Sequence, residues 1–220
     1  IYILVISSAS LLLGNISKEK ETRVMEILLT SITPHQLLTG KILGLGILGL
    51  GQALLWFGTS YVLMNRSSQV FQMAAQVNIP LSFLAWGIAF FLLGYAVYAS
   101  LMAGLGAMAP NLREASQATF VVLLPLMIPL VFASSIFAED PHGPIATVLS
   151  LFPLTAPVAM LSRLASGGVP AWQPWVAALL TLGTAVFIVR AVANMFRAQS
   201  LLAGGGFNVK VYLRALAGKL

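Results

Sequence analysis

Long apolar runs, separated by short polar stretches, make up most of this chain. The runs are continuous and do not alternate between polar and apolar positions, which favours helices over the strands of a membrane barrel. A helical span needs roughly 20 apolar residues. The pattern predicts five spans over residues of about 1–14, 41–64, 81–109, 117–138 and 175–193. We therefore expect an all-α, polytopic membrane bundle that forms a single transmembrane domain over residues 1–220.

The first run, IYILVISSASLLLG, is too short to cross a bilayer alone. It has no initiating Met, no basic leader and no cleavage site, so it does not fit a signal peptide. We expect that the chain begins inside a transmembrane helix and is the C-terminal part of a longer protein.

The densest group of charges lies in residues 15–40, between the first two predicted spans. Helical spacing there predicts one continuous amphipathic helix over residues 18–32, with polar and apolar side chains on opposite faces. Glu19 and Arg23 would then be oppositely charged i,i+4 neighbours. The polar face comprises Glu19, Arg23, Glu26 and Thr30, and the apolar face comprises Val24, Ile27, Leu28 and Ile32. The same stretch also fits a solvated loop that only connects two spans.

Two capping signals mark further helix starts. After a bend at residues 31–33, Thr33-Pro34-His35-Gln36 supplies an N-cap, a proline at the first helical position and a capping box. Asn111 and Glu114 form a similar N-x-x-E start before the fourth span. Arg113 and Glu114 would lie in a second inner loop, where they fit either a contact with a partner or a plain helix start.

Residues 141–170 do not fit a span. Their two apolar runs, GPIATVLSLF and APVAMLSRLA, are separated by Pro153 and Pro157 and are each too short to cross a bilayer. We expect two short re-entrant helices on the outer side, although an ordinary hairpin lying on lipid is equally compatible with the pattern. In the preceding span, Pro125 and Pro129 predict a kink.

The composition excludes a soluble domain. Only 8% of the residues are charged and 59% are hydrophobic, whereas a soluble domain carries about a quarter charged residues. The net charge of +6 therefore reports orientation rather than nucleic-acid binding. If the first span ends in the cytoplasm, the outer segments hold only Arg66 and Arg163 of the 12 basic residues, and the tail, residues 194–220, is cytoplasmic.

Catalytic and metal-binding motifs are missing from the sequence. The chain has no Cys, no G-x-S-x-G, no H-E-x-x-H and no Walker A motif, and no acidic residue is predicted at membrane depth. His35 and His142 are expected on opposite sides of the membrane, so they cannot share a metal. Gly44 to Gly49 matches G-x-G-x-x-G but follows no strand. We expect no catalytic residue, no metal and no cofactor, which disfavours an intramembrane enzyme and an ion-coupled transporter.

Three separated stretches resemble one family. KEKETRVMEILLTSITPHQLLTGKILG, FPLTAPVAMLSRLASGGVPAWQ and NMFRAQSLLAGGGFNVKVYLRAL are similar to the cytoplasmic segment, the outer hairpin and the tail of type-2 ABC export permeases. The resemblance is closest to the NatB-like sodium-efflux branch. Members usually have six spans with a soluble insert after the first, so this chain would lack that first span and the insert. The Ala-Gly-Gly-Gly run at residues 203–206 departs from the usual tail.

The resemblance implies that the charged segment is a coupling helix that contacts an ABC ATPase subunit. The implied coupling residues are Glu19, Lys20, Glu21, Arg23 and Glu26, with Arg113 and Glu114 as a second inner contact. The implied partners are that ATPase, a second permease subunit in a homo- or heterodimer, and the lipid bilayer, but no nucleic acid. The implied location is the cell membrane, as a multi-pass protein of a bacterial inner membrane with a cytoplasmic C-terminus.

The function that these inferences predict is the permease subunit of an ATP-driven exporter, not an enzyme itself, because ATP would be hydrolysed on a separate chain. The cargo would be sodium or a small amphipathic molecule. The alternative is a membrane anchor or regulator that binds an ATPase and transports nothing.

Overall fold

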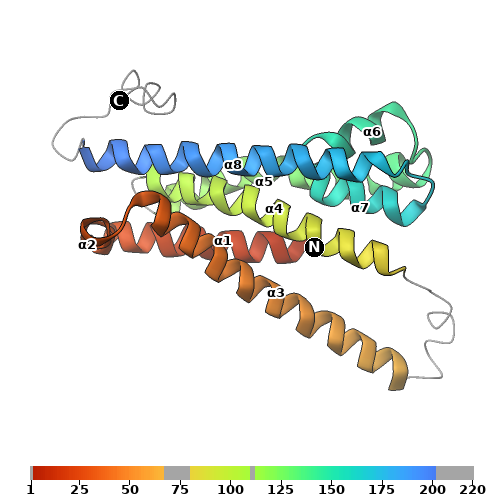
Figure 1. Cartoon of the computed structure of the whole chain (residues 1–220), viewed down its shortest axis with the longest axis horizontal. Helices are drawn as coiled ribbons and strands as arrows, with labels where there is room; N and C mark the ends of the chain where they lie inside the picture. The colour runs from red at the N-terminus through yellow and green to blue at the C-terminus, as the bar shows by residue number, and fades with distance from the viewer. Residues whose placement is uncertain (1, 67–79, 110–111, 202–220) are drawn as a thin grey trace.

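The computed structural model describes residues 2–66, 80–109 and 112–201, and these residues form a helical bundle (Figure 1). Its elements in chain order are α1 (Tyr2–Glu21), α2 (Val24–Ser31), α3 (Pro34–Arg66), α4 (Leu81–Met108), α5 (Leu112–Val131), the π-helix η2 (Ala133–Ala138), α6 (Pro144–Leu151), α7 (Ala156–Ser166) and α8 (Trp172–Leu201). The predicted all-α class is confirmed for the described part of the chain. Asn111, most of the predicted loop after residue 65 and most of the predicted tail lie outside it.

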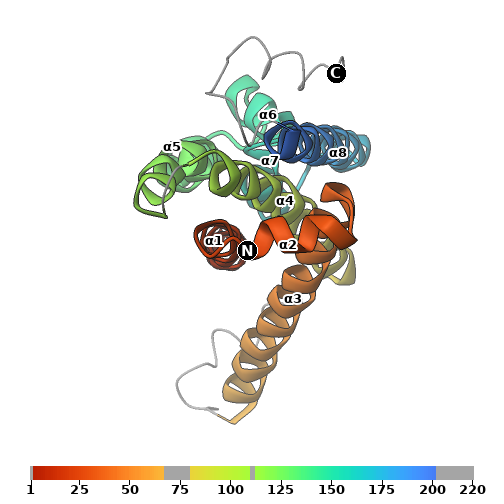
Figure 2. The same cartoon turned by 90° about the vertical axis from the view of Figure 1, so that its left-hand side faces the viewer.

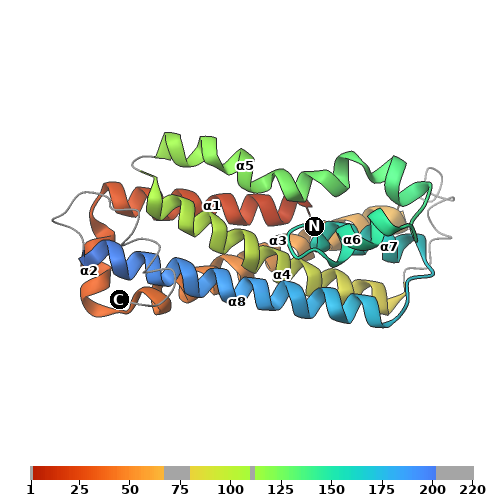
Figure 3. The same ribbon diagram turned by 90° about the horizontal axis from the view of Figure 1, so that it is seen from above.

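Helix α4 is the centre of the bundle. It packs most extensively against α1 and α8, and also contacts α3, α5 and α7. Figure 3 shows α1 and α8 running along it on different sides. Its sequence is apolar on all faces, as expected of a helix that is surrounded by others. Val97, Tyr98 and Met102 are accordingly buried in the main core.

Four described helices are long and apolar enough to cross a membrane. The candidate segments are Gln36–Trp56, Leu81–Ala107, Arg113–Val131 and Trp172–Asn194. The predicted first span, residues 1–14, forms part of α1, which is not among these four. The reason is that α1 continues without a break into the charged residues 18–21, which lower its mean hydropathy.

Helix α3 begins where the capping signal predicts. The Thr33 N–H donates to Gln36 Oε1 at 3.0 Å, and the Gln36 N–H donates to Thr33 Oγ1 at 3.3 Å. This reciprocal pair satisfies two amides that have no partner within the helix. The capping box is confirmed. Helix α3 therefore begins at Pro34, several residues before the predicted start of the second span at residue 41.

Two glycines let α3 approach its neighbours closely. A Cβ on Gly46 would lie 3.0 Å from Cε1 of Tyr95, and a Cβ on Gly49 would lie 2.7 Å from Oγ of Ser8. Past this contact α3 diverges from the bundle (Figures 1 and 2). The glycines therefore support close helix packing, as in other membrane helices, rather than the nucleotide motif that their spacing imitates.

The contact at Gly49 gives a stability prediction. We expect Gly49→Ala to lower the free energy of unfolding by about 1–3 kcal/mol, because the methyl group overpacks a closed contact. Gly51→Ala is the matched control, since a Cβ there meets nothing within 4 Å, and it should raise the free energy by about 0.5–1 kcal/mol. Thermal unfolding in detergent checks both. Equal shifts for the two variants would contradict the prediction.

The two short helices predicted after the fourth span are present. They are α6 and α7, of 8 and 11 residues, and both have Pro in their first turn. They lie at the opposite end of the bundle from α2 (Figure 1). Their place relative to a bilayer stays a prediction. The predicted fourth span, residues 117–138, corresponds to α5, which contains Pro125 and Pro129, together with η2.

Candidate coupling site at the α2 end

The predicted continuous helix over residues 18–32 is wrong, because the chain breaks at Arg23. Arg23 has a φ of 58°, a left-handed conformation that ends α1 and precedes α2. The Arg23 N–H donates to Lys20 O at 3.2 Å, and the Thr22 N–H donates to Lys18 O at 3.0 Å, which closes the last turn of α1. The expected polar face is therefore split, and Glu19 and Arg23 are no longer neighbours on one helix.

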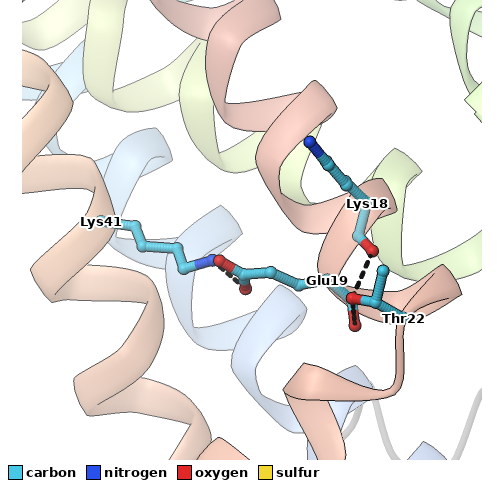
Figure 4. A network of polar contacts seen from close by, with 4 residues as sticks. All are labelled: Lys18, Glu19, Thr22 and Lys41. Carbon is cyan, nitrogen blue, oxygen red and sulfur yellow. Dashed lines mark hydrogen bonds and ion pairs between the residues drawn. The ribbon is translucent and has the colours of Figure 1, made fainter.

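Glu19 instead pairs with α3. Its carboxylate accepts a hydrogen bond from Nζ of Lys41, and both side chains are mostly shielded from solvent. Figure 4 shows the two side chains meeting between the ribbons of α1 and α3, with Thr22 Oγ1 bonded to Lys18 O beside them. The pair fixes the end of α1 to the first third of α3.

Lys20, the next residue, is bonded to α4. Its ammonium donates to Ala107 O at 2.6 Å and to Ala109 O at 2.8 Å. These carbonyls belong to the C-terminal end of α4, where the helix has unsatisfied acceptors and a partial negative charge. Burial lowers the pKa of the Lys20 ammonium. Consecutive residues of opposite charge thus tie α1 to two different helices.

Helix α2 is short, lies between two breaks and exposes apolar side chains. Of the predicted apolar face, Leu28 packs against the core, whereas Val24, Ile27 and Ile32 are 41%, 69% and 37% exposed. Glu21 and Arg23 beside them are also exposed, while the side chain of Glu26 lies outside the description. An exposed apolar cluster bordered by charges is a feature of protein and membrane interaction sites.

Arg113 and Glu114 lie in the first turn of α5, and both are exposed. The negative charge of Glu114 is favourable at this position, because a helix N-terminus carries a partial positive charge. This turn is at the same end of the bundle as α2 (Figure 3). Of the seven predicted site residues, the structure thus places Glu19 and Lys20 in interhelical contacts and Glu21, Arg23, Arg113 and Glu114 on the surface of this end.

Residues 1–193, nearly all of the described structure, match the family model described as ABC-2 family transporter protein. The chain belongs to this ABC-2 family. The family supplies the multi-pass membrane subunit of ABC transporters, which is generally not catalytic and normally partners with a separate ABC ATPase.

Two curated relatives support the assignment to the ABC-2 family. Uncharacterized protein YhaP of Bacillus subtilis is 30% identical over 223 residues, which cover 98% of this chain and 53% of YhaP. Uncharacterized protein MJ1024 of Methanocaldococcus jannaschii is 29% identical over 194 residues, covering 88% of this chain and 44% of MJ1024. The chain therefore spans about half the length of these relatives. No solved structure matches it.

A polar cluster that the sequence reasoning missed lies at the other end of this ABC-2 bundle. Arg163 of α7 is only 1% exposed. Its Nε donates to Pro141 O at 2.7 Å, and one terminal nitrogen donates to Ser150 Oγ at 2.7 Å and to Gln173 Oε1 at 2.8 Å. Burial lowers the pKa of the guanidinium. One side chain thus joins α7, α6, the start of α8 and the segment after η2.

The sequence held a signal for this cluster. Arg163 stands inside the apolar run APVAMLSRLA, and an isolated charge in such a run must either reach water or find buried acceptors. Counting it only as an outer charge overlooked the second outcome. The acceptors come from residues 141, 150 and 173, so their identity could not be read from local spacing.

An apolar cavity of about 630 Å³ lies between α1, α3, α4 and α7. Its volume is in the range of small-molecule sites, which are mainly apolar with few polar groups. The polar group of Ser162 is one of the few on its walls. The lining includes Tyr2, Leu54, Phe83, Gly87, Leu161 and Ser162.

Proposed function

We propose that this chain is the membrane-embedded part of an ATP-driven exporter and that a separate ABC ATPase docks on α2. One observation carries the proposal: Val24 and Ile27 of α2, and Ile32 directly after it, are exposed although α2 is held between two breaks at the charged end of the bundle. An exposed apolar helix face of this kind is expected where a partner covers it. In this proposal Glu21, Arg23 and Glu26 border the contact, and Arg113 and Glu114 add to it.

The proposed mechanism is mechanical. ATP-driven closure of two ATPase subunits displaces α2 in each of two permease subunits, which form a homo- or heterodimer around the transport path. The α2 end then faces the cytoplasm and the α6–α7 end faces outward, in agreement with the distribution of Lys and Arg. Family membership and the anchoring of α1 to α3 and α4 support this arrangement.

The apolar cavity favours a small amphipathic cargo over sodium. Sodium needs oxygen ligands, supplied in many transporters by backbone carbonyls at broken helices, and in this chain α5 with Pro125 and Pro129 is the helix that would supply them. A cavity of about 630 Å³ with an almost wholly apolar lining instead fits the hydrocarbon part of an amphipathic molecule. The sodium-efflux branch stays a prediction.

Reversing the charges beside α2 tests the docking role. The variant Arg23→Glu with Glu26→Lys should weaken co-purification of the ATPase with the full-length protein and lower ATP hydrolysis by the complex, because mismatched charges at a contact cost several-fold in affinity or more. The matched control is Glu139→Lys, which reverses an exposed charge directly after η2, at the other end of the bundle. Unchanged co-purification and unchanged hydrolysis in the α2 variant would refute docking at this site.

A membrane anchor that binds an ATPase without transport is the second candidate. The exposed face of α2 fits it equally, whereas the cavity favours transport. The two are separated by adding candidate cargoes to the complex in liposomes, because only a transporter should show cargo-dependent ATP hydrolysis together with vectorial movement of the cargo.

A further inference from the structure

The two carbonyls that accept hydrogen bonds from Lys20 lie on either side of the last residue of α4. Ala107 is in the last turn of α4 and Ala109 follows its final residue. The ammonium therefore sits on the helix C-terminus, where a cation is favoured by the exposed carbonyls and by the helix dipole. Both acceptors are backbone atoms, so the contact responds to where the end of α4 lies and not to the rotamer of a partner side chain.

Because Lys20 lies close to the start of α2, its contact with α4 also links these two helices. Lys20 is three residues before the left-handed Arg23, and α2 follows directly. Thr22 and Arg23 are both hydrogen-bonded back to the last turn of α1, so α2 is joined to Lys20 by a closed turn rather than by a slack loop. Along its length, α4 packs against α1, α3, α5, α7 and α8. A displacement of α2 thus has a short, continuous route to the helix that most of the bundle touches.

We propose that Lys20 is a positioning residue that passes movement of α2 to α4, and this rests on the proposed docking of an ATPase on α2. When the ATPase displaces α2, the end of α1 moves with it, and the two hydrogen bonds of Lys20 carry the end of α4 along. Without these bonds α2 still docks, but the end of α4 follows only through its packing against α1, so its movement is smaller.

The distance between α3 and α4 across the apolar cavity reports this movement. Leu54 of α3 and Leu84 of α4 both line the cavity and are exposed, and the 220 residues contain no Cys, which suits spin labelling at introduced cysteines. The pair is labelled in the full-length protein, bound to its ATPase, with any cysteines elsewhere replaced. The distance distribution is measured by pulsed electron paramagnetic resonance with and without a non-hydrolysable ATP analogue.

Lys20→Met is expected to reduce the shift in this distance that the ATP analogue produces, while co-purification of the ATPase is retained. Lys20→Arg should restore the shift, since a guanidinium can donate to both carbonyls. Lys18→Met is the matched control: it removes an exposed lysine from the same turn and should leave the shift intact. If Lys20 were only a structural cap, Lys20→Met would lower the unfolding temperature, but it would not reduce the distance shift while ATPase binding is retained.

The outcomes are distinct. A normal shift in Lys20→Met, or an equal loss in Lys18→Met, would overturn the role of Lys20 while leaving docking in place. Failure of the unmodified protein to bind the ATPase would refute the proposed function, and this inference with it. If Lys20→Met does not fold, the variant Lys20→Cys with Ala109→Cys is joined by a short bis-maleimide, which replaces the contact covalently. In this variant the spin labels at positions 54 and 84 are attached to azide-bearing unnatural amino acids, which do not react with the maleimide. If the distance shift is present in the cross-linked protein and reduced in the same protein without the cross-link, the contact transmits the movement of α2 to α4. If the shift is absent from both, the proposal is overturned.

Discussion

Replacing Arg163 by alanine is expected to lower the free energy of unfolding by about 3 kcal/mol, because three acceptors, two of them buried, lose hydrogen bonds from a charged donor. These acceptors are Pro141 O, Ser150 Oγ and Gln173 Oε1. For a chain of this size the loss corresponds to roughly 6–12 °C in the unfolding temperature. The measurement is thermal unfolding of the full-length protein in detergent.

Two variants show whether the effect belongs to the buried contacts. Arg163→Lys keeps the charge but not the planar fork of donors, so its free energy of unfolding should lie between those of the parent and the alanine variant. Lys18→Ala removes an exposed basic side chain outside the candidate spans and should change the free energy by no more than about 0.5 kcal/mol. An Arg163→Ala protein as stable as the Lys18→Ala protein would show that the cluster does not hold α6, α7 and α8 together.

Filling the apolar cavity is expected to abolish transport while leaving the fold intact. Gly87 of α4 lines the cavity, and a Cβ added there meets nothing within 4 Å. The ring of Gly87→Phe should therefore enter the cavity without displacing its walls. Since a pocket for a small amphipathic molecule works by enclosing its apolar part, we expect near-complete loss of ATP-dependent uptake of an amphipathic dye such as Hoechst 33342 into inside-out vesicles.

Gly183→Phe is the control for this variant. Gly183 lies on α8 outside the cavity lining, and its added Cβ would also meet nothing within 4 Å. It should transport the dye as the parent does, and both variants should unfold at the parental temperature. Full dye uptake by Gly87→Phe would remove the cavity from the transport path. Uptake of ²²Na⁺ but not of any dye by the parent protein would favour the sodium prediction instead.

Local signals explain what could be predicted from the sequence. The start of α3 needs only Thr33 and Gln36, whose side chains and amides are three residues apart. The separation of α6 from α7 is similarly local, because Pro153 and Pro157 interrupt the apolar runs. Long apolar helices are also local features, since the requirement for roughly 20 residues per span needs no knowledge of neighbours.

The features that the sequence did not predict depend on distant partners. Residues 18–32 contain no Gly or Pro, so nothing local indicates a left-handed residue at Arg23. The contact of Lys20 with the end of α4, three residues before the break, also joins residues far apart in the sequence. In the same way Glu19 had a plausible partner four residues away, yet it pairs with Lys41 on another helix. The arrangement of the candidate site therefore depends on contacts between helices, which local sequence patterns do not reveal.

The close contact of α3 at Gly49 divides that helix into two unequal arms. From Gly49 back to Lys41, where Glu19 holds it, is eight residues, or about 12 Å at 1.5 Å per residue. From Gly49 on to Arg66 is 17 residues, or about 25 Å. If the packed glycine acts as a fulcrum, a shift imposed at Lys41 reappears roughly doubled, and in the opposite direction, at the far end of the lever. The part of α3 that lines the apolar cavity, Leu50, Ala53 and Leu54, lies within about 8 Å of Gly49 on the long arm, so the cavity wall would move less than the far end of the helix.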